Sequence, residues 1–241
     1  MQTTPWLVRG CLVLAVSAQA ATNTWDGGST VDSNWSSAAN WNADTAPVSG
    51  SDTYLKFDGG TRLGPAQDLA SPFVLNRLDF PGGASYTAAF TIGGGQLQFV
   101  ASGSTQPRLF LDRNATCGIT NAIDIPAGVT LNAQIGTYGV DLRGPITGGG
   151  LIDKGEQAGG LSLYSSANTF SGGLIVRAQD NDWFKVNIYG SGAMGAGPVS
   201  LYGGTLATNR NSVGGLIFYN STTQTNSMTL YKSSPIHTFG T

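Results

Sequence analysis

The sequence predicts an all-β protein, a right-handed parallel β-solenoid (β-helix) with a Trp-rich N-terminal cap. Glycine accounts for 35 of the 241 residues, and only 11% of residues are charged. This composition suits short strands joined by tight turns, because glycine accepts the positive φ of such corners. A hydrophobic fraction of 40% is enough to bury a substantial core. Beyond the first 20 residues no segment has a sustained 3.6-residue apolar period, so no amphipathic helix is expected.

Short apolar-x-apolar triplets recur along the chain, each with the two-residue period of a strand that buries one face. They are Leu78–Phe80, Leu97–Phe99, Leu109–Leu111, Ile123–Ile125, Val129–Leu131, Val140–Leu142, Leu161–Leu163, Val199–Leu201 and Met228–Leu230. Such strands are shorter than the typical sandwich strand of about five or six residues. The polar, Gly-rich links between them lack the two-residue hairpin turns of a β-meander. A stack of β-coils, each contacting only its neighbours, therefore fits better than a β-sandwich.

The N-terminus predicts a signal peptide over residues 1–20. Arg9 provides a positive charge, the apolar stretch Gly10–Ser17 follows it, and Ala18-Gln19-Ala20 is a small-x-small cleavage site, so we place the cut after Ala20. The apolar stretch is too short to span a bilayer. The alternative interpretation is a buried first strand of the domain.

The mature chain divides into two predicted parts. Residues 21–60 are rich in Trp and Asp and are expected to form the N-terminal cap. Residues 61–241 are expected to form the solenoid, with the clearest repeat at 144–206. Residues 207–241 contain strand-like pieces but no visible polar cap, so we expect the chain to be truncated at its C-terminus. An open final coil exposes unpaired strand edges, which predicts self-association through that end.

Within residues 144–206 the chain reads GPITGGGLIDKGEQAGGLSLYSSANTFSGGLIVRAQ, followed by the closing segment SGAMGAGPVSLYGGTL. This string resembles the autotransporter-associated β-strand repeat of bacterial exported proteins. The matching residues are Gly144, Ile146, Gly148, Gly150, Lys154, Gly160, Leu161, Leu163, Asn168, Thr169, Phe170, Gly172 and Gly173. The opening segments TWDGG and NWSSAANWN also look like the start of such proteins. One departure is Glu156–Gly159, where the family more often has small residues.

The resemblance implies a passenger-type β-helix of a Gram-negative-type bacterium, secreted or displayed at the cell surface or outer membrane. Its role would be structural or adhesive, without catalysis. The mechanism would be presentation, in which a rigid stack holds loops away from the cell. Its partner would be a cell-surface or extracellular polysaccharide or protein. The alternative is a carbohydrate-binding or polysaccharide-cleaving parallel β-helix, which an exposed groove lined with converging carboxylates and aromatic side chains would favour.

Composition and motifs exclude several other functions. The formal net charge is −2, and no basic patch is present to neutralise nucleic-acid phosphates. No transmembrane segment is expected. The only histidine, His237, follows Ser233 and Ser234, but closeness in sequence does not provide the oriented carboxylate of a catalytic triad. We therefore assign no catalytic, cofactor-binding or metal-binding residue.

Three further groups of residues could form sites, but a structural role is favoured for each. Asp153, Lys154 and Glu156 lie close in sequence, but Lys154 belongs to the repeat pattern. Calcium requires several converging oxygen ligands, whereas the acidic residues are scattered. They are Asp26, Asp32, Asp52 and Asp58 in the cap and Asp180 and Asp182 further along. Cys117 has no cation or base beside it in sequence, which is typical of a small buried hydrophobic residue.

Trp25, Trp35 and Trp41 have two possible roles. They could form a sugar-stacking platform, but a hydrophobic plug that closes the first coil is favoured, because an uncovered solenoid end exposes its core and strand edges. The pair Trp183-Phe184 is a candidate for an exposed contact point.

Overall fold

The chain folds into parallel β-sheets stacked as a solenoid. The computed structural model describes residues 22–83, 85–177, 185–203, 205–208, 215–219, 222–231 and 236–237. The only helical elements among them are the two 3-10 turns η1 (Ala38–Asn40) and η2 (Asn42–Asp44). No helix in this part of the chain is long and apolar enough to cross a membrane. The signal peptide predicted at residues 1–20 lies outside the described residues.

Sheets 1 and 2 each have nine strands in the described part of the chain. Sheet 1 contains, in spatial order, β1 (Thr22–Trp25), β2 (Tyr54–Phe57), β5 (Arg77–Gly83), β8 (Arg108–Arg113), β11 (Thr130–Ile135), β14 (Leu151–Lys154), β16 (Gly173–Arg177), β18 (Val199–Tyr202) and β21 (Met228–Leu230). Sheet 2 contains β3 (Ala66–Gln67), β6 (Thr91–Gly94), β9 (Cys117–Ile119), β12 (Gly139–Leu142), β15 (Gly160–Leu163), β17 (Lys185–Ile188), β20 (Gly215–Phe218), β19 (Thr205–Thr208) and β22 (Ile236–His237). Sheet 3 contains β4 (Phe73–Leu75), β7 (Leu97–Phe99), β10 (Ile123–Asp124) and β13 (Ile146–Thr147).

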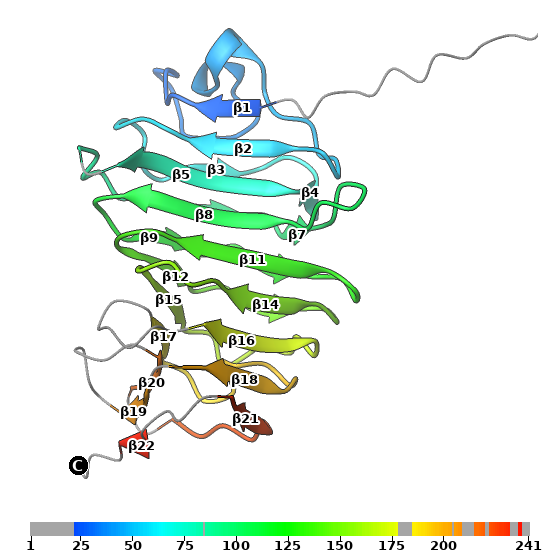
Figure 1. Cartoon of the computed structure of the whole chain (residues 1–241). Coiled ribbons are helices and arrows are strands. Elements are labelled where there is room, and N and C mark those ends of the chain that lie inside the picture. Colours follow the sequence, from blue (N-terminus) through cyan, green and yellow to red (C-terminus); the bar gives the residue numbers. More distant parts are fainter. Residues whose placement is uncertain are drawn as a thin grey trace, which may run out of the picture.

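From β2 to β15 the chain visits the three sheets in turn, and the described strands after β15 belong to sheets 1 and 2. All the strand pairs of these sheets are parallel. Figure 1 shows the strands of sheet 1 stacked from β1 to β21 along the molecule. The spacing between hydrogen-bonded residues of neighbouring coils varies, for example from 22 at Ile146–Asn168 to 34 at Gly190–Gln224. Within each sheet the spatial order of the strands follows their order in the sequence, with one exception: β19 lies between β20 and β22. The predicted all-β parallel β-solenoid is confirmed.

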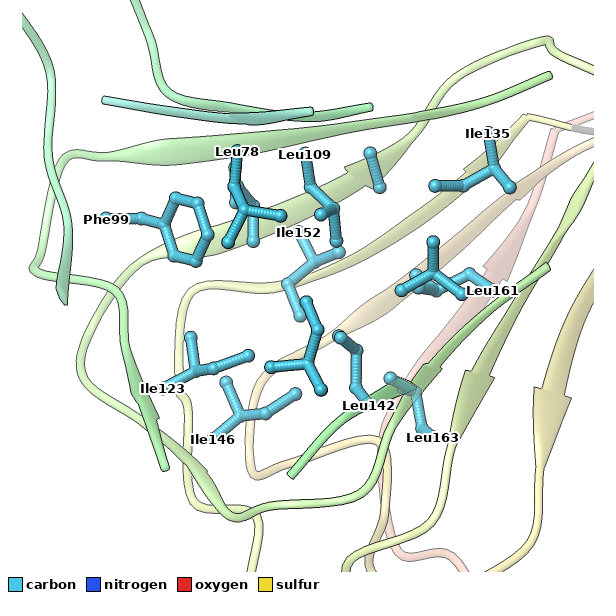
Figure 2. Packing of buried hydrophobic residues seen from close by; sticks show 14 of the residues in the cluster. Leu78, Phe99, Leu109, Ile123, Ile135, Leu142, Ile146, Ile152, Leu161 and Leu163 are labelled. Atoms are coloured by element: carbon cyan, nitrogen blue, oxygen red, sulfur yellow. The ribbon is translucent and has the colours of Figure 1, made fainter. Parts of the chain in front are cut away.

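The core fills the space between the sheets. Strand β11 alternates buried and half-buried residues, as a period-2 strand with one inward face must. Figure 2 shows Leu109 and Ile152 of sheet 1 facing Leu161 and Leu163 of sheet 2, with Ile146 of sheet 3 on the remaining side. Leu161 and Leu163 are both fully buried, so the inward face predicted from the triplet is correct. Full burial of one such side chain stabilises the fold by about 1.5–3 kcal/mol.

The three tryptophans of the N-terminal segment close the first coil. Trp25, Trp35 and Trp41 are all 0% exposed. Trp41 packs edge-on against Trp25 and Trp35, with ring centroids 5.1 and 5.9 Å apart, and its indole Nε1 donates to the Trp35 carbonyl at 2.9 Å. Phe57 lies beneath all three rings. The predicted Trp-rich cap is thus confirmed, and complete burial excludes the sugar-stacking platform.

A buried asparagine continues the third side of the solenoid beyond sheet 3. Asn168 lies where the next strand after β13 would be, and it bonds to the coils on both sides. Its Oδ1 accepts from the Ile146 amide at 2.8 Å, and its Nδ2 donates to the Ala193 carbonyl at 2.7 Å. At the preceding corner Gly148 has φ +97, and a Cβ there would lie 2.1 Å from the Ile125 carbonyl oxygen. Within the repeat, Asn168 is therefore a bridging position and Gly148 a corner position.

Candidate functional site

A groove runs over the outer face of sheet 2, and the two-residue period of the strands decides what lines it. In β12 the side chains of Val140 and Leu142 are buried in the core, so Gly139 and Asp141 face outward. The register pairs Gly139 with Gly160 and Asp141 with Ser162. It also pairs Ser162 with Asn187 of β17. Parallel pairing thus aligns a glycine column and a column of small polar side chains.

The groove has a volume of about 650 Å³, within the range of small-molecule sites. Its floor comes from the two columns described above, with Lys185 beside Gly160. Thr137, Tyr138 and Ala158 line it where the strands of sheet 2 begin, and Tyr164 and Tyr189 line it where they end. Because Gly139 and Gly160 carry no side chain, the surface is hollow between the wall that contains Tyr138 and the wall formed by Tyr164 and Tyr189.

The wall at the strand ends is a ladder of stacked tyrosines. The rings of Tyr164 and Tyr189 are 4.4 Å apart and parallel within 5°, and Tyr189 stacks on Tyr219 at 4.5 Å. The Arg143 guanidinium covers Tyr164 at 5.1 Å. Both faces of the Tyr164 and Tyr189 rings are therefore covered by a stacked ring or by Arg143. This wall offers the edges of the rings and their hydroxyl groups to the groove.

Asp141 is the carboxylate among the groove-lining residues that the structure describes. Its Oδ2 accepts from Arg143 Nη2 at 2.8 Å, and it also interacts with Tyr164. Burial, the charge of Asp141 and Tyr189 raise the pKa of Tyr164 to about 12. The Tyr164 phenol therefore keeps its proton at neutral pH. Glycoside hydrolysis commonly uses two carboxylates that flank the scissile bond, and a single ion-paired one suits binding better than cleavage.

Asp153, Lys154 and Glu156 lie close in sequence but do not converge in the structure, in keeping with the structural role predicted for Lys154. Lys154 points into the core and is 1% exposed; its Nζ donates to the carbonyls of Gly155 at 2.9 Å and Gln157 at 2.7 Å. Burial lowers the pKa of Lys154 to about 8, although the charge of Asp153 opposes that shift. Both carboxylate oxygens of Asp153 accept hydrogen bonds from Arg177 on the outer face of sheet 1, and Glu156 is exposed.

The other candidate residues from the sequence do not line the groove. No group of three or more metal-ligating side chains forms among the described residues. Asp32 bonds to Ser37 at 2.7 Å within the cap, and Asp58 pairs with Lys56 at 2.5 Å. Asp180, Asp182, Trp183-Phe184, Ser233 and Ser234 lie outside the described residues, while His237 belongs to β22.

Cys117 faces the core, as the sequence predicted. The side chain is fully buried, and burial raises the pKa of its thiol to about 11. A thiol that stays protonated at neutral pH is a poor nucleophile, so its role here is packing.

Comparisons of the chain with protein-family models, curated proteins and solved structures give no match. The resemblance to the autotransporter-associated repeat therefore remains a prediction.

Sequence reasoning missed the groove. The sequence does contain the residues of the ladder that forms one wall: Arg143, Tyr164, Tyr189 and Tyr219 each follow a short apolar stretch. Unequal numbers of residues separate these four, so no fixed period revealed the column before the strand register was known.

Proposed function

We propose that this chain is an exported, structural or adhesive β-solenoid displayed outside the cell in the manner of a passenger domain. The observation that carries the proposal is the bonding of outward side chains from coil to coil. On sheet 2 the tyrosine ladder joins successive coils. On sheet 1 the Tyr202 and Tyr231 rings stack at 4.2 Å, and Arg177 covers Tyr202 at 5.1 Å. Such surface ladders stiffen a stack that must hold its shape as an extended scaffold.

The described acidic groups of the outer faces support a scaffold rather than a catalyst. Asp79 of sheet 1 is 2% exposed and bonds to Arg77, Arg108 and the Tyr54 hydroxyl. Asp153 is held in the same way by Arg177. Hydrogen bonds from arginine hold such a carboxylate in a fixed orientation. It serves coil stacking better than proton transfer.

Expression of the full chain in a Gram-negative host tests the proposal. We expect the protein to leave the cytoplasm with Ala21 as its first residue, and protease added to intact cells to degrade it. The matched control is Ala20→Arg, which removes the small residue that signal cleavage requires and should leave the leader attached. Wild-type protein that stays in the cytoplasm and retains residues 1–20 would refute the proposal.

A further inference from the structure

Gly160 has no backbone reason to be glycine, whereas Gly139 is favoured in part by the close approach of a backbone carbonyl. Neither has a left-handed φ. A Cβ on Gly160 would lie 3.5 Å from its nearest neighbours, the side chains of Asn187 and Lys185, and one on Gly139 would lie 3.3 Å from the Gly160 carbonyl oxygen. Glycine inside a strand is unfavourable, because it gives up more conformational freedom than other residues. What the two glycines provide is the open floor of the groove.

Asn187 is a second and independent sign of a ligand. Its side chain lines the groove and is only 7% exposed. Its Nδ2 donates to Ser162 Oγ at 3.2 Å, but its Oδ1 has no hydrogen-bond partner in the described structure. Buried polar atoms in folded proteins nearly always have a partner. This oxygen is itself buried, so a ligand donor reaches it once the Asn187 amide rotates toward the groove, and the Ser162 hydroxyl keeps its own proton to donate.

The lining excludes three ligand classes. Tyrosine rings and Ala158 contribute apolar area to the lining, but a wholly apolar ligand would leave the polar atoms of Asp141, Ser162 and Asn187 without partners. A peptide cannot add as a strand, because β12 and β15 already pair on both sides. The lining holds Lys185 and Asp141 as its charged groups, and this balance does not attract nucleic acid or another polyanion.

A neutral oligosaccharide meets the remaining requirements. Sugar hydroxyls both donate and accept, which matches the carboxylate of Asp141, the amide of Asn187 and the hydroxyls of Ser162 and Tyr164. Tyr138 is 50% exposed on the opposite wall, and within the described residues no aromatic ring or cation covers it. Its amphipathic ring can pack against the C–H face of a sugar while its hydroxyl stays in water.

We infer that the groove on the outer face of sheet 2 binds a neutral oligosaccharide, with a sugar ring against Tyr138 and hydroxyl groups on Asp141, Ser162 and Asn187. The ligand lies over Gly139 and Gly160 and runs across the strands, along the solenoid. The groove binds this ligand without cleaving it. Oligosaccharide binding does not depend on where the protein is displayed. Binding can therefore be absent while the proposed function holds, and it can be present while the proposed function fails.

Titration calorimetry on the purified full chain tests the inference with cellohexaose, maltohexaose, xylohexaose, mannohexaose and chitohexaose as probes. We expect saturable binding of at least one of them with a Kd below about 1 mM, and no shortening of the bound sugar. Trigalacturonic acid, a charged probe, should bind at least about tenfold more weakly.

Two variants locate the binding. Gly160→Val fills the groove floor and suits a strand, and Tyr138→Ala removes an exposed ring; each should weaken binding by about tenfold or more. The matched control is Gly64→Val, at an exposed glycine with no left-handed φ and no atom within 4 Å of a Cβ, which should leave the Kd unchanged. Circular dichroism confirms that each variant is folded, and Tyr138→Ala retains the test if Gly160→Val is not.

Three results would overturn the inference. None of the five neutral hexaoses binds at about 10 mM, both groove variants bind as tightly as wild type, or trigalacturonic acid binds more tightly than every neutral probe. The last result would assign the groove to an acidic polysaccharide instead.

Discussion

Lys154 makes the stability of this solenoid depend on pH in a direction that can be worked out. The ammonium group is buried in the core, and burial lowers its pKa to about 8 from an ordinary value of 10.5. A base whose pKa is lower in the folded state holds fewer protons folded than unfolded between these two values. Stability must therefore rise with pH across that window, because the penalty for burying the charge disappears.

The size of the effect follows from the two pKa values. Their difference, 10.5 − 8, is about 2.5 units, which at about 1.4 kcal/mol per unit corresponds to a penalty of about 3 kcal/mol at pH 7. At pH 10 most of this penalty is relieved, so the free energy of unfolding should increase by about 2 kcal/mol between pH 7 and pH 10. Measurements must stop there. Tyr54 and Tyr164 have pKa values raised to about 12, so their contribution to stability is lost as the pH rises above 10.

Urea unfolding followed by circular dichroism at pH 7, 8, 9 and 10 measures this rise. Lys154→Met removes the titrating group and keeps an unbranched side chain, so its unfolding midpoint should be nearly constant over this range. Lys56→Met removes a lysine of the same sheet that is 32% exposed and should leave the rise in place. A wild-type midpoint that is flat or falls from pH 7 to pH 10, or a Lys154→Met variant that keeps the full rise, would refute the reasoning.

Three other predictions follow from single buried groups. Leu161→Asp places an unpaired charge in the core and should cost several kcal/mol, about 3 or more, seen as a large fall in melting temperature; an unchanged melting curve would contradict the assigned inward face. Arg113 is 0% exposed and bonds to the carbonyls of Phe57, Pro81 and Ala88, so Arg113→Met should destabilise by about 3 kcal/mol, whereas Arg143→Met, at a 54% exposed side chain, should cost less than about 1 kcal/mol. Equal losses for the two arginine variants would show that burial does not set the cost. Asn168→Ala removes two inter-coil hydrogen bonds and should cost about 2 kcal/mol, with faster amide exchange at Ile146 as the diagnostic signal; unchanged exchange there would argue against the bridge.

Local patterns predicted the fold class because a solenoid coil is built from local rules. The triplet at Leu161–Leu163 alternates inward and outward residues whatever its neighbours are, and the structure buries both leucines. The tryptophans of the opening segment were predicted to cover the first coil because an open end is unfavourable, and they do so. The repeat pattern predicted a structural role for Lys154 but not its burial in the core, because a pattern match does not reveal which way a charged side chain points.

The sequence by itself determined that this chain forms short parallel strands around an apolar core, because strand period, glycine corners and aromatic plugs act over a few residues. Only the tertiary structure decided which outward residues lie side by side. Asp141, Ser162 and Asn187 form one column because backbone pairing sets the register between coils, and coils of unequal length hide that register in the sequence. The groove, its tyrosine wall and its glycine floor exist only after the coils have stacked.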